Sequence, residues 1–398
     1  MGEFVMRLPD DVAFILDTMK NAGFSAHVVG GSVRDSLIGR ELGDFDITTN
    51  ALPEQTKAVF NDYRTVDTGI KHGTVTLVLN GIPYEITTYR VDGDYKDNRH
   101  PDSVCFTASL REDLERRDFT VNAMAYNTDT GLSDPFDGRG DAAAKLIRAV
   151  GDPYKRFDED ALRILRALRF ASVLGFEIED MTARAVRERA HLLSAISKER
   201  IYTELKKLVM GVDAEKILTD YSEVISPLLS GLNVTRLPRR ELFDSAETVV
   251  RFAALFLLNS ESAAEHSERA FTELKTDKLT RTRVFAMLDA YCRVELTDER
   301  AVLTALAMYG AETVCDVLNL GLLCERFARK ECVMLESVLA SGKPYRISDL
   351  SLRGGDIAAM GFKGERIGEM LNKLLFAVID GRVENTATEL SRFAKNEL

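Results

Sequence analysis

The feature that most constrains this fold is the point at which strand signals stop. Before residue 141, short segments rich in Val, Ile, Thr and Tyr are bounded by Gly, Asn or Asp. These segments are HVVGG, DFDITT, HGTVTLVLNG, PYEITTYR and VNAMAYN. From about residue 141 onward, apolar residues recur with helical spacing, as in DEDALRILRALRFASVLG. The sequence therefore predicts an α+β fold, with a mixed sheet in an N-terminal head and an all-helical remainder.

The length of the chain predicts more than one core. A chain of 398 residues exceeds the size at which single cores stop growing, and two to four domains are expected. We expect a catalytic head over residues 1–140, a helical neck over 141–205, a helical body over 206–285 and a helical tail over 286–398. The signals are weakest between the neck and the tail.

Charge and composition limit the partners and the compartment. The net charge of −11, from 52 basic and 63 acidic residues, argues against a surface that binds nucleic acid throughout. Any RNA site must therefore be a local basic cluster. The five cysteines lack the C-x-x-C spacing of zinc sites, which fits a reducing cytoplasm. No apolar run approaches the roughly 20 residues that span a bilayer. We expect a cytoplasmic protein without a membrane segment, and the sequence leaves a homodimer open.

Two carboxylates lie one residue apart in the stretch GDFDITT. On a strand, Asp44 and Asp46 project from one face while Phe45 and Ile47 point into the core. A divalent cation would relieve the repulsion, and Mg²⁺ is usually held by one or two carboxylates together with substrate phosphates. Glu85, in PYEITTYR, could add a third catalytic acid from another strand. An edge strand with a solvated acidic face is the alternative explanation of this pattern alone.

A glycine pair precedes these acids in VVGGSVRDSLIG. An apolar strand runs through Gly30 and Gly31 into a helix with Ser32 near its start, where backbone N–H groups can receive phosphate oxygens. Arg34, in the first turn, adds a fork-shaped donor for a polyphosphate. An ordinary strand-to-helix turn is the alternative. The acid pair shortly downstream favours the phosphate site.

A charged cluster opens the segment LERRDFTVNAMA. Arg116, Arg117 and Asp118 precede an apolar, strand-like run, and the density of cations there suits a triphosphate. The alternative is an ion-paired surface turn, in which nearby acids neutralise the arginines. These acids are Glu112, Asp113 and Glu115.

The stretch DEDALRILRALRF, interpreted as one helix, has a polar and an apolar face. The polar face carries Glu159, Asp160, Arg163 and Arg166. Asp160 and Arg163 are three residues apart, so they would present adjacent acceptors and donors that can contact a base edge. A salt bridge on a solvated face is the alternative. Arg169 falls outside the polar face. The apolar face carries Ala161, Leu162, Ile164, Leu165 and Leu168.

These motifs together resemble those of a known family. GGSVRD, GDFDITT, RRDFTVNAMA, DPFDGRGD and DEDALRILRALRF, in this order, are similar to the motif set of class II tRNA nucleotidyltransferases. That family comprises CCA-adding enzymes and their poly(A) polymerase relatives. The close resemblance covers residues 22 to about 205 and implies a polymerase-β-like head. It also implies Mg²⁺-dependent, template-independent addition of CCA to the 3′ end of tRNA from CTP and ATP, with release of pyrophosphate.

The resemblance also implies roles for individual residues. Asp44 and Asp46 would hold Mg²⁺, and Arg117 would contact the incoming nucleotide. Asp160 and Arg163 would bond the Watson–Crick edge of CTP or ATP, so that protein replaces a nucleic-acid template. The other implied nucleotide-binding residues are Gly30, Gly31, Arg34, Asp118, Asn122, Glu159, Arg166 and Arg169.

Two further segments bear on specificity and on tRNA binding. Residues 90–113 form a long polar connection, and in this family such a loop accompanies the use of ATP. It favours CCA or A addition over CC addition. The tail resembles the C-terminal domain of bacterial CCA-adding enzymes, which grips the tRNA elbow. Its candidate phosphate contacts are Arg346, Arg353, Lys363, Arg366 and Lys373, for which a solvated helical surface is the alternative.

Three alternative functions remain open. Two are enzymes: an A-adding tRNA nucleotidyltransferase and a poly(A) polymerase. The third is a non-catalytic tRNA-binding protein that has kept the fold.

Overall fold

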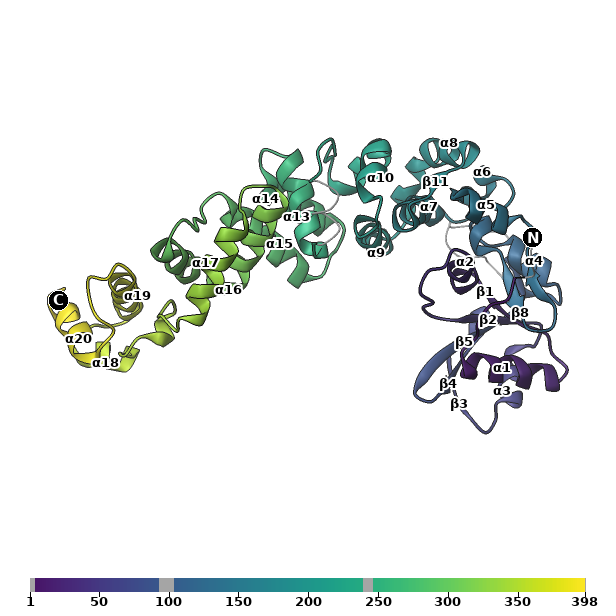
Figure 1. Cartoon of the computed structure of the whole chain (residues 1–398), viewed down its shortest axis with the longest axis horizontal. Coiled ribbons are helices and arrows are strands. Elements are labelled where there is room, and N and C mark those ends of the chain that lie inside the picture. The colour runs from purple at the N-terminus through teal and green to yellow at the C-terminus, as the bar shows by residue number, and fades with distance from the viewer. Residues whose placement is uncertain (1–3, 93–103, 239–245, 398) are drawn as a thin grey trace. The chain divides into compact units, whose positions relative to one another are not determined.

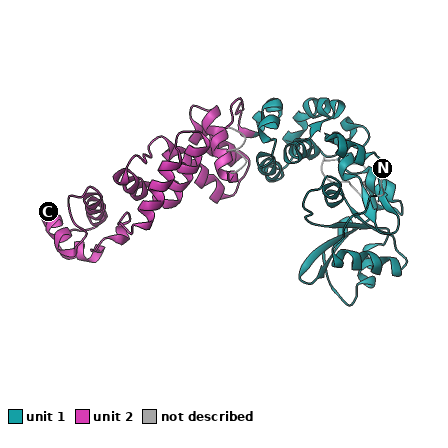
Figure 2. Ribbon diagram, viewed as in Figure 1, with its two compact units in different colours: residues 1–228 teal, residues 229–398 magenta. Residues whose placement is uncertain are grey.

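A computed structural model describes residues 4–92, 104–238 and 246–397. The chain forms two compact units, Met1–Leu228 and Leu229–Leu398 (Figure 2). The finer division into head, neck, body and tail remains a prediction.

The first unit contains a seven-stranded sheet with the order β3-β4-β5-β2-β1-β8-β9 (Figure 1). Within it β2 and β5 run parallel, and the other neighbouring strands run antiparallel. The predicted mixed sheet is therefore confirmed. The strands are β1 (Ala26–Val29), β2 (Asp46–Thr49), β3 (Arg64–Gly69), β4 (Thr74–Leu79), β5 (Ile82–Thr88), β8 (Ala125–Asn127) and β9 (Gly131–Ser133).

Alternating side chains anchor this sheet in its core. Along β4, Val75, Leu77 and Leu79 are buried while the intervening threonine and valine side chains are less so, as a half-buried strand requires. The helices α1 (Asp10–Asn21) and α3 (Pro53–Val59) lie on one side of the sheet (Figure 1). Their apolar residues join a core that includes Leu77, and burial of that area stabilises the head.

Short elements surround the sheet and lead away from it. They are α2 (Gly31–Leu37), α4 (Leu110–Glu115), α5 (Gly138–Ala144) and the antiparallel pair β6 (Arg90–Asp92) and β7 (Val104–Phe106). A parallel pair, β10 (Leu146–Ile147) and β11 (Glu177–Ile178), lies after residue 141. The prediction that strands end there is wrong in this detail, because two-residue strands are too short to show alternation.

The rest of the first unit is helical. Its helices are α6 (Pro153–Glu159), α7 (Leu162–Leu174), α8 (Asp180–Glu188), α9 (Lys198–Val209), α10 (Ala214–Asp220) and α11 (Ser222–Ile225).

The prediction of one continuous helix over DEDALRILRALRF is wrong. Asp160 is extended, with φ −138° and ψ 102°, and separates α6 from α7. Its Oδ1 accepts a hydrogen bond from the Leu162 backbone N at 3.0 Å. The Asp160 side chain thus pairs with a backbone N–H at the start of α7 that has no partner within the helix. Aspartate is common at helix starts because it can make this hydrogen bond.

The described part of the second unit is built from helices, as predicted. They are α13 (Thr248–Asn259), α14 (Ala263–Glu273), α15 (Lys278–Tyr291), α16 (Glu299–Leu323), α17 (Arg329–Ala340), α18 (Gly354–Ala359), α19 (Glu365–Ile379) and α20 (Ala387–Lys395). By length and composition alone, α16 could cross a membrane, which differs from the expectation that no apolar run is long enough. In this structure 44% of its most apolar stretch is buried inside the protein. Gly310, with φ 78° and ψ 160°, divides it into two segments that are each shorter than a bilayer span.

Candidate active site

A pocket of about 450 Å³ lies in the first unit. Most of the nucleotide-site residues expected from the sequence line it, and they come from segments far apart in the chain. Asp44, Glu85, Glu159 and Arg169 lie outside its lining. The lining residues are Gly30, Gly31, Arg34, Asp46, Arg116, Arg117, Asp118, Asn122, Asp160, Leu162, Arg163, Arg166, Phe170 and Arg200.

The acids meet where β2 begins. The parallel register pairs Ile47 with Ile86, so Asp46 and Glu85 are neighbours at adjacent strands. Asp44 was expected on the strand but lies just before it, because β2 begins at Asp46. Partial burial raises the pKa of Asp46, and the negative charges of Glu85 and Asp44 raise it further against the opposing effect of Arg117.

The donor set at these acids fits a divalent cation. Within residues 4–92, 104–238 and 246–397, no ion pair forms on Asp44, Asp46 or Glu85, and the charge of Arg117 offsets part of the repulsion at Asp46. Carboxylate oxygens are the ligands that Mg²⁺ takes. Among the described residues no three acids, histidines or cysteines are already gathered as a metal cage. A cation here would therefore take its remaining ligands from water and substrate phosphates.

The glycine turn lets an arginine approach the start of α2. Gly30 has φ 73° and ψ −127°, a conformation that side chains disfavour. A Cβ built there would lie 3.4 Å from Arg117 Nη1, so the guanidinium packs directly against this turn. The predicted strand-to-helix geometry is confirmed, because α2 begins at Gly31.

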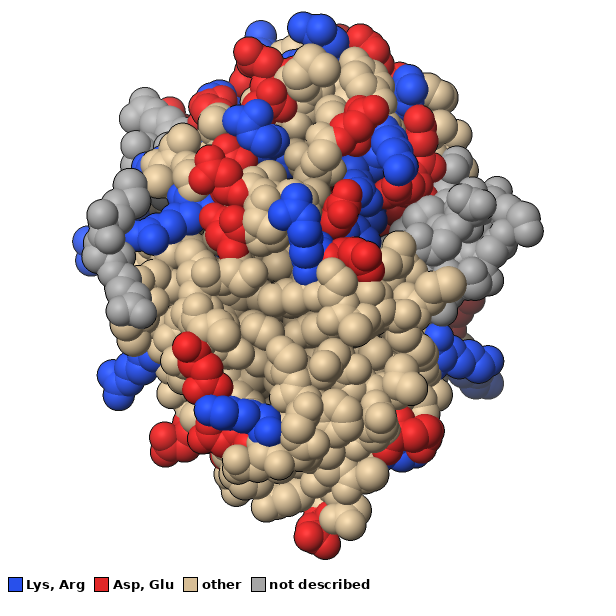
Figure 3. Space-filling view, turned by 90° about the vertical axis from the view of Figure 1, so that its right-hand side faces the viewer, with Lys and Arg blue, Asp and Glu red and all other residues tan. Residues whose placement is uncertain are grey.

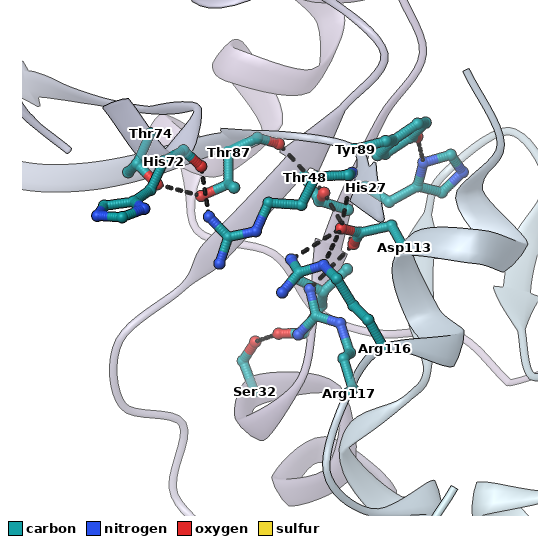
Figure 4. A network of polar contacts seen from close by, with 12 residues as sticks. His27, Ser32, Thr48, His72, Thr74, Thr87, Tyr89, Asp113, Arg116 and Arg117 are labelled. Atoms are coloured by element: carbon teal, nitrogen blue, oxygen red, sulfur yellow. Dashed lines mark hydrogen bonds and ion pairs between the residues drawn. The ribbon is translucent and has the colours of Figure 1, made fainter. Parts of the chain in front are cut away.

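The buried Asp113 carboxylate organises the arginine pair (Figure 4). It accepts hydrogen bonds from Arg116 Nε at 3.0 Å, from Arg117 Nη2 at 3.3 Å and from Thr48 Oγ1 at 3.2 Å. Burial alone would raise the pKa of Asp113, but the positive charges of Arg116 and Arg117 outweigh it and lower the pKa. The sequence showed Asp113 only as a local neutraliser. Its spacing of three and four residues from the arginines was the available signal.

A second set of hydrogen bonds connects four residues that line the pocket. Asp118 Oδ2 accepts from Arg166 Nε at 2.7 Å, and its Oδ1 accepts from Asn122 Nδ2 at 3.1 Å. Asn122 Oδ1 accepts from Arg34 Nη1 at 2.5 Å. Although burial opposes ionisation of Asp118, the Arg166 charge lowers its pKa to about 2. Arg34 is also paired with Asp35, so much of its donor capacity is used within the protein.

The predicted base-reading residues have different partners from those expected. Arg163 Nη1 donates to Glu159 Oε2 at 2.8 Å, and its Nη2 donates to the Arg116 carbonyl at 2.9 Å. Asp160 Oδ2 instead accepts from Arg200 Nη2 at 3.2 Å. Asp160 and Arg163 thus have different partners within the protein, and both line the pocket.

Two arginines lie where the sequence analysis did not expect them: Arg169, which it assigned to nucleotide binding, and Arg200, which it did not assign. Arg169 forms an ion pair with Glu204 at 2.6 Å and lies 3.8 Å over the ring of Phe170; Phe170 lines the pocket and Arg169 does not. Arg200 lines the pocket from α9, although it lies outside every recognised motif. No local pattern around Arg200 signalled this position.

Charge on the surface is mixed. Figure 3 shows acidic and basic side chains intermingled over the upper part of one face, with a largely uncharged lower part. In the second unit, Lys363 and Arg366 are exposed, and no ion pair forms on them among the described residues. Lys373 is paired with Glu397. Residues 93–103 of the predicted loop lie outside the described residues.

Two family models match the chain. The model described as the poly A polymerase head domain matches residues 26–148. The model described as a probable RNA and SrmB-binding site of polymerase A matches residues 175–223. Among curated proteins, the chain is 38% identical to the CCA-adding enzyme of Streptococcus pyogenes serotype M3 over 412 residues. That match covers 100% of this chain and 98% of the relative.

Solved structures resemble the chain over its length. The Bacillus stearothermophilus CCA-adding enzyme in complex with CTP has a TM-score of 0.82 and 31% identity, and the match covers 98% of each chain. The Thermotoga maritima CCA-adding enzyme complexed with tRNA has a TM-score of 0.66 and 21% identity, covering 98% of this chain and 97% of that one. At that identity the second match speaks for the fold alone.

Proposed function

The chain belongs to the CCA-adding enzymes, and we propose that it adds CCA to the 3′ end of tRNA from CTP and ATP without a nucleic-acid template. The main support for this proposal is that one pocket is lined by Asp46, Arg117, Asp160 and Arg163, which come from separate segments of the chain. An acid for a cation site, a partly buried cation and a donor–acceptor pair are the parts that selective nucleotidyl transfer requires.

The triphosphate would lie against the start of α2. Arg117, held by Asp113 beside Gly30, presents a guanidinium at the turn, and Gly30 and Gly31 line the same pocket. In the reaction, the 3′-oxygen of the RNA forms a bond to the α-phosphorus, and the bond to the leaving pyrophosphate breaks. The hydroxyl proton passes to solvent. The residues contribute mainly by positioning the groups and balancing their charge.

Asp46 and Asp44 are the residues that would hold Mg²⁺, with Glu85 adding negative charge from the neighbouring strand. The ion, when bound, would favour ionisation of the attacking hydroxyl and offset charge on the phosphates. Burial is the main cause of the raised pKa of Asp46, and the charges of Glu85 and Asp44 raise it further. This second contribution supports the assignment, because a bound cation would relieve the repulsion between the acids.

Base selection would rest on Asp160 and Arg163. Cytosine and adenine each carry an exocyclic amino group, which can donate a hydrogen bond to a carboxylate. Uracil and guanine carry an oxygen at the corresponding position, which cannot. Arg163 supplies donors for the ring acceptors, and Glu159 holds it in place. A site of fixed donors and acceptors rejects a base that leaves those groups unpaired.

We further propose that tRNA is bound in part by exposed cations of the tail, including Lys363 and Arg366, and that the enzyme is cytoplasmic. A net charge of −11 means that RNA affinity must come from such local clusters. The possible homodimer is tested by sedimentation of the purified protein.

A sequencing-gel assay tests the function directly. The substrates are tRNAs that end at the discriminator base, at C and at CC, each with CTP, ATP or both in the presence of Mg²⁺. Stepwise CCA addition that then stops is expected. AMP addition only to the CC-ended tRNA would indicate an A-adding enzyme, and long adenylate tails would indicate a poly(A) polymerase. Absence of any incorporation would favour a binding protein.

A further inference from the structure

Arg200 is the residue through which α9 reaches the pocket wall. Its Nη2 donates to Asp160 Oδ2 at 3.2 Å, across 40 residues of sequence. Its Nη1 is buried without a hydrogen-bond partner among the described residues. A buried guanidinium nitrogen without a partner is costly, and such exceptions call for a functional explanation.

The position of Arg200 within its own helix is also unfavourable. It lies in the first turn of α9, which begins at Lys198. The positive end of the helix dipole disfavours a cation there. The Asp160 carboxylate offsets this unfavourable charge, so the two residues depend on each other.

The rest of α9 is fixed against α7, so Arg200 is held rigidly. One turn beyond Arg200, Glu204 forms an ion pair with Arg169 of α7 at 2.6 Å. Another turn on, the Leu208 carbonyl accepts a hydrogen bond from Ser172 Oγ at 2.7 Å. These contacts along α9 limit the movement of its first turn relative to the pocket.

Asp160 itself is held from two sides. Its Oδ1 accepts from the Leu162 backbone N at 3.0 Å, and its Oδ2 accepts from Arg200. A carboxylate has about four lone-pair directions, so acceptor capacity remains for a ligand in the pocket. Without Arg200, the carboxylate would keep the Leu162 hydrogen bond and lose the one on Oδ2.

We propose that Arg200 is a positioning residue that sets base specificity by orienting the Asp160 carboxylate toward the exocyclic amino group shared by CTP and ATP. This inference rests on the proposed function of the same pocket. Arg200 acts through Asp160 and leaves the phosphate chemistry to other residues. Its loss should therefore weaken nucleotide discrimination and nucleotide binding more than it slows transfer from a saturated site.

The test measures incorporation of CTP, UTP, ATP and GTP by the full chain, at saturating tRNA, for the wild type, Arg200→Gln and Arg200→Lys. For Arg200→Gln we expect the UTP/CTP and GTP/ATP ratios of kcat/KM to rise at least about tenfold, mainly through a higher KM for CTP and ATP. Arg200→Lys should fall between the two, because lysine keeps the charge but not the planar fork. Arg189→Gln is the matched control. It breaks the ion pair between Arg189 and Asp158, whose atoms are 2.7 Å apart, and neither residue lines the pocket.

The outcomes separate this inference from the proposed function. If the wild type adds CCA and both Arg200 variants keep wild-type discrimination, the positioning role is overturned while the function stands. If the wild type itself incorporates no nucleotide, the proposed function fails first. If Arg200→Gln does not fold, Arg200→Lys decides by the same ratios, with intermediate discrimination supporting the role and unchanged discrimination excluding it.

A double variant adds a second criterion. Asp160→Asn combined with Arg200→Gln should discriminate no worse than Asp160→Asn alone, because Arg200 acts through Asp160. Additive losses would show that Arg200 contacts the nucleotide independently and would contradict the positioning role.

Discussion

The Arg163 guanidinium lies 2.8 Å from the Glu159 carboxylate, across the break between α6 and α7. Both groups are largely buried, and Glu159 also accepts from Arg156 Nη1 at 2.9 Å. Glu159 therefore contacts the arginine that we propose to read the base, and restricts its direction without lining the pocket. This arrangement makes Glu159 a residue that acts through Arg163.

Glu159→Gln should lower kcat/KM for both CTP and ATP. The substitution replaces a charge-assisted hydrogen bond with a neutral one at a mostly buried arginine, at a cost of about 1.5–3 kcal/mol, or roughly tenfold to a hundredfold. Single-nucleotide incorporation kinetics measure the loss. Glu215→Gln, at an exposed position of α10, is the control and should match the wild type. An unchanged kcat/KM in Glu159→Gln would remove Glu159 from the site.

Asp46→Ala should abolish nucleotide incorporation while tRNA binding stays within a few fold of the wild type. In the proposed mechanism Asp46 holds a cation, and tRNA affinity is expected to depend on other residues. A gel-shift titration measures binding, and radiolabelled CTP incorporation measures activity. Asp129→Ala removes an exposed acid that pairs with Lys20 and should leave activity intact. Activity of purified Asp46→Ala would refute the metal assignment.

His27 should make the first unit less stable as the pH falls. Burial lowers the pKa of His27 to about 4 from its ordinary value of 6.5, so the unfolded chain binds the proton first as the pH falls. Stability is then full above about pH 6.5 and declines toward pH 4, by about 3 kcal/mol in total.

Urea unfolding between pH 7 and pH 4.5 measures this dependence. His27→Gln keeps polar groups near Tyr89 but does not titrate, so its stability should fall less steeply with acid than that of the wild type. His191→Gln changes an exposed histidine and is the control. Equal slopes for wild type and His27→Gln would contradict the prediction.

Gly138→Ala should destabilise the head through a steric clash. A Cβ at Gly138 would lie 2.2 Å from the Thr120 carbonyl oxygen, closer than any real contact allows. The backbone must shift, at a cost of about 1–3 kcal/mol. Thermal unfolding should show a lower Tm. Gly43→Ala, where a Cβ meets nothing within 4 Å, should keep the wild-type Tm, and equal values for the two variants would exclude the clash.

Lys363→Ala combined with Arg366→Ala should weaken tRNA binding and flatten its salt dependence. If both cations contact phosphates, their removal reduces the slope of log K against log salt by about 1 to 2 units. Fluorescence anisotropy at several salt concentrations measures the slope. The control pair, Lys278→Ala with Lys330→Ala, also removes two exposed cations. An equal effect in both pairs would show only a general dependence on net charge.

Local pattern was enough to predict part of this fold and site. Strand alternation, the turn at Gly30 and Gly31, and helical spacing after residue 141 depend on backbone geometry within a few residues. The alternation in DFDITT placed Phe45 and Ile47 toward the core and Asp46 on the other face, and this is what the structure has. The strands β10 and β11 were not predicted, because two residues are too few to show alternation.

The helix break at Asp160 shows where local pattern misled. A wheel drawn through residues 158–170 assumes one continuous helix, but the Asp160 side chain satisfies the Leu162 N–H and stabilises a new helix start. This capping option competes with helix continuation, and apolar periodicity carries no information on which of the two prevails.

The sequence by itself determined the fold class and most of the residues that line the pocket, because motif residues are recognised by their type and near spacing. Only the tertiary structure decided how those residues are held. Asp113 beneath Arg116 and Arg117, Glu159 behind Arg163, and Arg200 against Asp160 are contacts made by packing. The last of these contacts joins residues 40 positions apart in the sequence, and packing of α9 on α7 brings them together.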